Sequence, residues 1–373
     1  MADAPRATLR IQGATVRVLV AYDIGLSIRL DACRAHVGGL EDDERIRHKG
    51  HAPQYFQFDP APLRLVREFE PIEVGGRRTS GTAEILLYDF GGVSVGYAIP
   101  FTGTLAELIE LSCALASEPR IETHAEQLVA HLLDLIREHV DRPGLADPEE
   151  DFLVFQIPAF EGDRDAEVVL NEHAADFARL LRSERDCPSD QEVQEALSGR
   201  VRFGAQDLAV LDWNAALLVD REPEDVVSVL EFANLQLLEM RFLDAKLDRS
   251  LDRAYEALQT PRLWSVLRLP GTARKEMRAV AQMQVDGAIL FERVSNALKL
   301  LGDQYLARVH RTATQRFRLN EWNSGILRKL DTLDSIHQKL HEHASTQRME
   351  VLEWIIILLI AFEIVMPFLG IGK

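Results

Sequence analysis

Val351-Leu-Glu-Trp-Ile-Ile-Ile-Leu-Leu-Ile-Ala-Phe-Glu-Ile-Val-Met-Pro-Phe-Leu-Gly-Ile371 is the stretch that decides the predicted architecture. From Trp354 to Ile371 only one residue, Glu363, is charged. As a helix rising about 1.5 Å per residue this run reaches roughly 27 Å, close to the hydrocarbon thickness of a bilayer. We therefore predict a C-terminal membrane anchor over 351–373. Its residues are Trp354, Ile355, Ile356, Ile357, Leu358, Leu359, Ile360, Phe362, Glu363 and Pro367.

Glu363 is the feature that weighs against this anchor. Each Leu, Ile, Phe or Val at depth contributes about −0.3 to −0.6 kcal/mol on insertion scales, whereas a central acidic residue costs about 2.5 to 3.5 kcal/mol. The apolar side chains together outweigh one glutamate, and we expect Glu363 to face protein rather than lipid, which favours self-association. The alternative is a C-terminal helix buried in a soluble oligomer, where a neighbouring group satisfies Glu363.

The rest of the chain is long enough for two further structural units. We divide its 373 residues into an acidic α+β domain (1–220), a long helical hairpin or coiled-coil stalk (221–350) and the anchor (351–373). A hydrophobic content of 47% and a charged content of 27% exclude a disordered chain. Cys33, Cys113 and Cys187 are isolated, which disfavours a disulfide scaffold or a zinc ribbon. No signal peptide is evident in Met1-Ala-Asp-Ala-Pro5.

The formal net charge of −17 is unevenly distributed along the chain. Residues 1–239 carry −22, residues 240–350 carry +6 and residues 351–373 carry −1. Basic residues before a spanning helix predict a single-pass protein whose N-terminal domain lies on the cytoplasmic side. The basic arm either attracts anionic lipid headgroups or is a solvated coiled-coil surface, and the sequence leaves both open.

Periodicity gives the predicted elements of the N-terminal domain. Strands are expected over 16–22, 55–58, 63–69, 83–88, 93–99 and 152–157, with a hairpin turn at Gly91-Gly92 and another strand or hairpin over 208–219. Thr104-x-x-Glu107 and Thr123-x-x-Glu126 predict helices to Leu115 and Val140. A short helix over 24–33, a strand over 168–170 and a helix over 172–182 complete the pattern.

From Pro223 the pattern is helical to the end of the chain. One helix extends to Leu258, a second begins near Thr272, and a third continues into the anchor. Heptad spacing in the third predicts a long antiparallel hairpin or coiled coil that self-associates into a homo-oligomer. The positions expected on its seam are Leu319, Trp322, Ile326, Leu333, Ile336 and Leu340.

Few residues suggest chemistry. Asp89-Phe-Gly91 lacks the companion motifs of a kinase, and the His337/His341 pair lacks a third ligand, so we predict no catalytic residue, cofactor or metal. A strip of four arginines without an intervening acid is a candidate contact for the phosphates of RNA or lipid. It equally fits pairing with acids of the preceding helix, Asp244, Asp248 and Asp252. The strip is Arg308, Arg311, Arg316 and Arg318.

The segment Leu352 to Val365 resembles the C-terminal signature of the family called "required for meiotic nuclear division", which is known as YagE-like in bacteria. Val20-Ala-Tyr22, Asp89 to Pro100 and Ala209 to Glu224 are similar to its first strand, its hairpin and the entry to its helical pair. The resemblance implies an α+β domain of unknown activity, a helical hairpin and one C-terminal transmembrane helix. Eukaryotic relatives are organellar membrane proteins that support translation, and no catalytic residues carry over.

Three functions remain open at this stage. The first is a membrane-tethered, self-associating scaffold or adaptor without catalytic activity, with the lipid bilayer as its partner. The second is an enzyme or ligand sensor with its site in the acidic α+β domain. The third is a membrane tether that binds RNA or a ribosome through the arginine strip.

Overall fold

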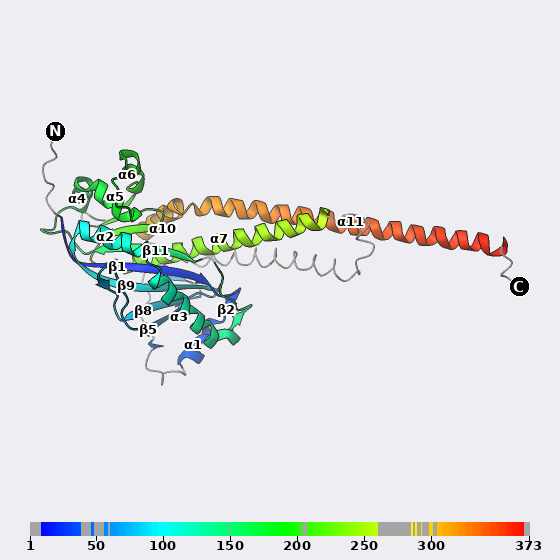
Figure 1. Cartoon of the computed structure of the whole chain (residues 1–373), viewed down its shortest axis with the longest axis horizontal. Coiled ribbons are helices and arrows are strands. Elements are labelled where there is room, and N and C mark those ends of the chain that lie inside the picture. Colours follow the sequence, from blue (N-terminus) through cyan, green and yellow to red (C-terminus); the bar gives the residue numbers. More distant parts are fainter. Residues whose placement is uncertain are drawn as a thin grey trace. The chain divides into compact units, whose positions relative to one another are not determined.

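A computed structural model describes residues 9–38, 46–47, 56–58, 60–147, 149–202, 204, 207–259, 285, 288, 292, 298–300 and 304–368 (Figure 1). Its side chains are described at these positions except 37–38, 46–47, 56–58, 257–259, 298–300, 337, 340–352 and 363–368. The chain divides into two compact units. The head unit comprises Met1–Phe242 and Leu290–Asn323. The other unit, here named the hairpin unit after the helical hairpin that the sequence predicts, comprises Leu243–Ile289 and Ser324–Lys373.

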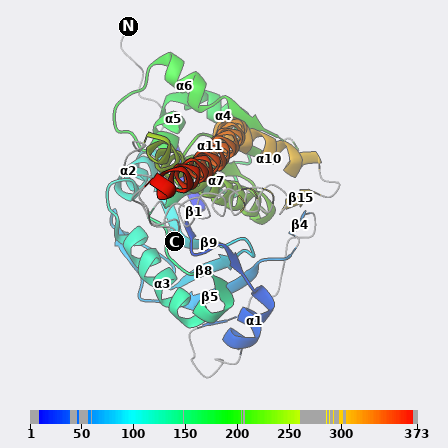
Figure 2. The ribbon, with the colours of Figure 1, turned by 90° about the vertical axis from the view of Figure 1, so that its right-hand side faces the viewer.

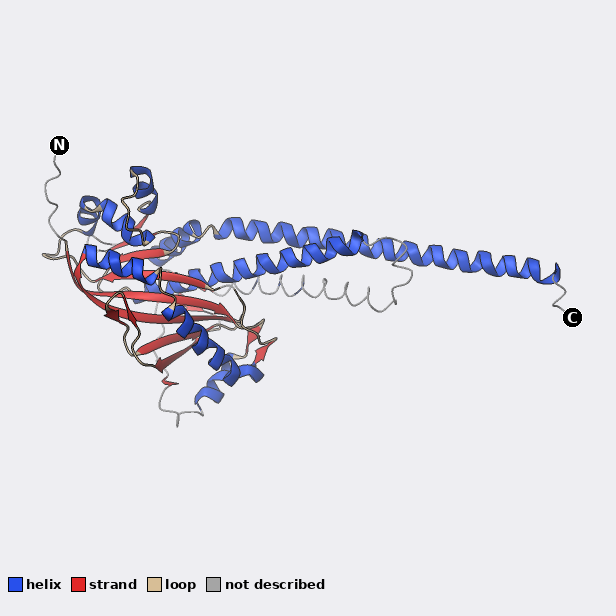
Figure 3. Cartoon of the chain, viewed as in Figure 1, coloured by secondary structure: helices blue, strands red, loops and turns tan. Residues whose placement is uncertain are grey.

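Strands predominate in the first part of the head unit (Figure 3). They are β1 (Arg10–Asp23), β2 (Ser27–Ile28), β3 (Ile46–Arg47), β4 (Phe56–Phe58), β5 (Leu63–Glu68), β6 (Glu73–Val74), β7 (Arg77–Arg78), β8 (Thr82–Leu87), β9 (Gly92–Thr104), β10 (Val140–Asp141), β11 (Glu150–Ile157), β12 (Gly199–Val201), β13 (Leu208–Leu211), β14 (Ala215–Val219) and β15 (Leu298–Leu300).

Helices connect the strands and follow them. They are α1 (Leu30–Gly38), α2 (Leu105–Leu115), α3 (Arg120–Ile136), the 3-10 helix η1 (Arg137–His139), α4 (Ala166–Glu172), α5 (Ala174–Arg182), α6 (Asp190–Ala196), α7 (Glu224–Gln259), α10 (Gln304–Arg316) and α11 (Leu319–Phe368). Both α7 and α11 cross the boundary between the two units.

One mixed sheet organises the head unit. In the described residues its strand order is β12-β13-β14-β11-β1-β9-β8-β5-β3. β1 lies between β9 and β11 and pairs antiparallel with both, with Val18 opposite Tyr97 on one side and Leu153 on the other. β11 and β14 pair in parallel, with Phe155 opposite Leu217. Since α4 to α6 and two further strands separate β11 from β14, the pairing depends on contacts distant in sequence.

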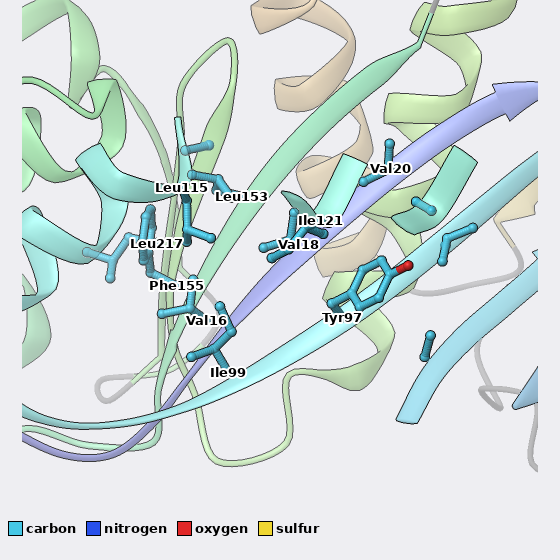
Figure 4. Close-up of a cluster of buried hydrophobic side chains, with 14 of the residues drawn as sticks. Val16, Val18, Val20, Tyr97, Ile99, Leu115, Ile121, Leu153, Phe155 and Leu217 are labelled. Carbon is cyan, nitrogen blue, oxygen red and sulfur yellow. The ribbon is translucent and has the colours of Figure 1, made fainter. Parts of the chain in front are cut away.

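Alternate residues of the strands point to a first face that carries the main core. Figure 4 shows Val16, Val18 and Val20 of β1 gathered with side chains from the neighbouring strands and from two helices. The other labelled members are Tyr97, Ile99, Leu115, Ile121, Leu153, Phe155 and Leu217. All are buried, and α2 and α3 supply the helical side of this core. Burying a side chain of this size contributes about 1.5 to 3 kcal/mol.

The intervening residues form a second core on the opposite face. Phe152 and Val154 of β11 lie there with Leu218 of β14, and residues from the start of α7 and from α10 cover them. Figure 2 shows α3 on one side of the sheet and the beginning of α7 on the other. The central strands are therefore buried on both faces, which explains the continuous apolar runs Val18–Tyr22 in β1 and Phe152–Phe155 in β11.

In the hairpin unit, α7 and α11 supply buried apolar residues at helical spacing. Leu243 and Leu247 of α7 and Ile326, Leu333 and Ile336 of α11 are buried. Heptad-like spacing of three, four and seven residues keeps one stripe of each helix covered. Within the ranges given above, no helix meets the length and apolarity needed to cross a membrane.

The predicted fold class is confirmed in its coarser form: an α+β region with a mixed sheet is followed by helices that pack together. The predicted helix from Thr272 lies almost wholly outside the described residues, as do the side chains of His337 and His341. Residues 351–373, the predicted anchor, have described side chains only at 353–362.

Some element predictions are wrong for identifiable reasons. Residues 168–170 belong to α4, because Asp165 caps a helix by accepting from the backbone N–H groups of Glu167 and Val168. α3 begins at Arg120, and the Thr123 hydroxyl donates to the Pro119 carbonyl instead of capping. The helix predicted over 24–33 is replaced by β2 and the later α1.

Candidate functional sites

The segment Trp354–Phe362 of α11, here called the apolar segment, is the most unusual surface of the described residues. Its large hydrophobic side chains are between 49% and 65% exposed. Successive residues of a helix point about 100° apart, so nine consecutive positions expose apolar groups on every side. The exposed residues are Trp354, Ile355, Ile356, Ile357, Leu358, Leu359, Ile360 and Phe362. The side chains of Glu363 and Pro367 lie outside the described residues.

The predicted seam positions do not act as one group. Leu319 belongs to the second-face core, and Trp322 is half-buried in the same head unit. Ile326, Leu333 and Ile336 are buried in the hairpin unit, and the side chain of Leu340 lies outside the described residues. The seam is thus at least partly covered within a single chain.

The hairpin unit also contains an ionic contact. Lys329 Nζ lies 2.6 Å from Asp244 Oδ1 and 2.7 Å from Asp248 Oδ1. Asp244 and Asp248 are two of the three acids named above as alternative partners of the arginine strip, and here they pair with Lys329 instead.

The arginine strip divides into two kinds of side chain. Arg308 donates to the Arg202 carbonyl at 2.9 Å, and Arg316 is engaged with the head. Arg311 and Arg318 are exposed, and Arg318 lies in a left-handed turn (φ 53°) between α10 and α11. The strip therefore offers fewer free guanidinium groups for phosphate than its four residues suggest.

Arg316 is part of an ionic network around Asp212, a residue that is 1% exposed in the β13–β14 turn. One Asp212 oxygen pairs with Arg316, and the other accepts from Arg182 Nε at 3.3 Å. Arg316 also donates to the Ser198 hydroxyl and the Glu195 carbonyl. The network thereby joins α5, α6, the β13–β14 turn and α10, and its geometry is that of a structural contact that holds these elements together.

A cavity of about 90 Å³ lies where β11 and β14, the parallel pair, end. Ligands of open α/β sheets bind outside the carboxyl ends of parallel strands. Its apolar lining is Pro158, Ala159, Phe160 and Val219, and its charged lining is Asp163, Arg164, Asp207, Asp220 and Arg221.

The charged groups of the cavity are mostly paired. Arg221 lies 3.0 Å from Asp163, and Arg164 pairs with Glu172. Burial raises the pKa of Asp220, the charge of Asp207 adds to this rise, and the Glu222 N–H opposes it. A volume of 90 Å³ is about three times the volume that one water occupies in the liquid and well below the about 300 to 1,000 Å³ of small-molecule sites. This cavity suits a few waters or a small ion.

In the described part of the chain, no group of three or more His, Cys, Asp or Glu side chains is arranged to hold a metal ion. Cys33 and Cys113 are buried and Cys187 is exposed, all as free thiols. Burial raises the pKa of Cys33 to about 11, which opposes formation of the nucleophilic thiolate.

A family model described as "Uncharacterized protein MJ0711, N-terminal domain" matches residues 13–225, more than half of the chain. The chain belongs to this family. A relative in Methanocaldococcus jannaschii, described as uncharacterized protein MJ0711, is 22% identical over 214 residues. That match covers 57% of this chain and 65% of the relative, slightly under two thirds of its length.

Membership of the MJ0711 N-terminal family corrects the resemblance drawn from the sequence. The relationship to the "required for meiotic nuclear division" family is wrong, because the matched residues 13–225 include Val20–Tyr22, Asp89–Pro100 and Ala209–Trp213, three of the segments on which it depended. These segments lie in strands and turns of the sheet, where β-branched and glycine patterns recur among unrelated proteins.

Sequence reasoning missed the residues of the cavity and of the Asp212 network in this member of the MJ0711 N-terminal family. Asp220 and Arg221 directly follow an apolar strand, a signal for a site at a strand end, but only the parallel pairing with β11 gives that signal weight. Asp212 is separated from Arg182 by 30 positions and from Arg316 by 104, so no local spacing connects them.

Proposed function

We propose that this protein is a membrane-anchored, self-associating scaffold whose α+β head lies on the cytoplasmic side. The observation that carries the proposal is the apolar segment, since a helix that exposes apolar groups all round requires a non-aqueous environment or a protein partner. Its seven Ile, Leu and Phe side chains favour insertion by about 2 to 4 kcal/mol together. Beyond the apolar segment the sequence to Ile371 is apolar apart from Glu363.

Membrane insertion is tested by flotation of the full chain with liposomes after an alkaline wash. Ile356→Asn with Leu359→Asn places two polar groups on one side of the apolar segment, and we expect the protein to leave the lipid fraction. Ile356→Leu with Leu359→Ile is the matched control and is expected to float like the wild type. If the asparagine pair also floats, or if the wild type is monodisperse in plain buffer, membrane anchoring is wrong.

The orientation is tested with Cys187, because its thiol is exposed whereas those of Cys33 and Cys113 are buried. A membrane-impermeant maleimide is expected to label it in inverted bacterial vesicles and not in right-side-out vesicles. Cys187→Ser provides the background signal. Labelling only from the outer side would refute the cytoplasmic placement of the head.

Self-association is tested by cross-linking of the full chain in detergent. Since Ile326, Leu333 and Ile336 are already buried within one chain, we take the apolar segment and Glu363 as the candidates for the contact. We expect Glu363→Leu to weaken the oligomer while leaving flotation unchanged. An oligomer of unchanged stability would remove Glu363 from the contact.

A further inference from the structure

Side chains from the first half of α7 contact the start of β9. A Cβ built on Gly92 would come within 2.8 Å of the Leu235 and Phe90 side chains, so a larger residue here would force these side chains to shift. Ser94, two residues after Gly92 in β9, is also small and is 1% exposed. Asn234 of α7 donates to the Glu150 carbonyl of β11 at 3.1 Å, on the far side of β1. α7 is therefore seated directly on the second face of the sheet in the head unit.

A carboxyl group is enclosed in this contact. Glu231 of α7 is 7% exposed, and its Oε1 accepts a hydrogen bond from the Ser94 hydroxyl at 2.7 Å. A buried carboxylate with a single neutral donor is poorly solvated, since an ionised carboxylate accepts several hydrogen bonds in water.

The other groups facing Glu231 come from three strands and from the residue that follows one of them. Arg17 of β1 and Arg64 of β5 act on it as cations, Glu84 of β8 acts as an anion, and Tyr88 beyond β8 is fully buried nearby. Arg64 makes its salt bridge with Glu84 at 2.8 Å. Arg64, the cation with the larger effect on Glu231, is thus already paired with another acid.

We propose that Glu231 is a proton-sensitive latch, which holds α7 on the sheet while it is a neutral acid and loosens that contact when it ionises. The helix it holds is the one that continues from the head unit into the hairpin unit. This proposal does not depend on membrane anchoring.

The sign of the effect follows from linkage. Burial, with the charge of Glu84 in support, raises the pKa of Glu231 from 4.5 to about 7, while Ser94, Arg64 and Arg17 oppose the rise. The folded head therefore binds the proton more tightly than an opened head, and its stability declines as pH rises from about 4.5 to about 7. Between pH 6 and pH 8 the opening equilibrium is expected to rise about tenfold.

Hydrogen exchange of the full chain in detergent measures this equilibrium at residues 224–242 of α7 and 92–104 of β9, after correction for intrinsic exchange rates. The wild type is expected to lose about tenfold in protection from pH 6 to pH 8. Glu231→Gln keeps the acceptor for Ser94 but has no proton to lose, and its protection should not change. Glu224→Gln alters an exposed glutamate of the same helix and should behave like the wild type.

Two further measurements keep the test decisive if Glu231→Gln fails to fold. The infrared band of a protonated carboxyl should be present in wild type at pH 6 and disappear near neutral pH. Ser94→Ala should move this midpoint to higher pH, because the lost donor stabilises the ionised form. A wild type with no protonated carboxyl at pH 6, or a Glu231→Gln variant with the full tenfold dependence, overturns the latch.

Discussion

Replacing Asp212 by asparagine tests whether the ionic network holds α10 to the head. The substitution preserves the shape of the side chain but leaves Arg182 and Arg316 facing an uncharged amide. Their side chains are 14% and 17% exposed, so water compensates them poorly. Removing one partner from a buried pair typically costs about 3 to 5 kcal/mol, because a buried charge remains unpaired. Such a loss is a large part of the about 5 to 15 kcal/mol that stabilises a typical domain.

The measurement is urea unfolding of the full chain in detergent, followed by far-ultraviolet circular dichroism. Asp163→Asn is the matched control, because Asp163 pairs with Arg221 at 3.0 Å and the two side chains are 63% and 65% exposed. An exposed pair of this kind contributes less than about 1 kcal/mol. If the free energies of unfolding of Asp212→Asn and Asp163→Asn differ by less than about 1 kcal/mol, the network does not hold α10 to the head. Arg316→Gln in both backgrounds then measures the coupling of that pair.

Three further substitutions test other contacts. Gly92→Val should destabilise the head by about 1 to 3 kcal/mol by crowding α7, measured as a lower urea midpoint, whereas the open position Gly144→Ala should be near neutral. Lys329→Met should lower the stability of the hairpin unit by about 1.5 to 3 kcal/mol, seen as faster hydrogen exchange in α11, because its two aspartates lose their cation. Thr104→Ala should lower the stability of the head by about 0.5 to 2 kcal/mol, because it removes a capping box. Thr123→Ala is the control, because it removes no cap. If Thr104→Ala melts at the same temperature as this control or higher, the prediction is wrong.

Local signals predicted the elements well where the residues that decide them are neighbours in sequence. The capping box at Thr104 and Glu107 begins α2 as expected, because both of its hydrogen bonds lie within four residues. The same pattern at Thr123 failed, because Pro119 had already placed the helix start and the hydroxyl bonds back to its carbonyl. A motif of this kind locates a helix but does not fix its first residue.

Contacts between residues distant in sequence explain the remaining differences between the predicted and the observed structure. Val168, Val169 and Leu170 suit a strand by side-chain type, yet the Asp165 cap and the burial of two of the three residues place them in α4. Glu231 looks like an ordinary polar position of a helix, and only the placement of α7 over β9 reveals that it is buried. Charged residues that become buried through long-range packing carry no local mark in the sequence.

The extent of the family match has a consequence for what constitutes the head. The match ends at residue 225, in the first turn of α7. The second-face residues Phe152, Val154 and Leu218 lie inside the matched stretch, whereas α7 and α10, which cover them, lie almost entirely outside it. Without those helices this face would present a contiguous apolar surface to water, at about 25 cal/mol for each Å² exposed. In this chain the head therefore includes the start of α7 and all of α10, and the contact at Glu231 lies inside a folding unit that the matched stretch alone does not complete.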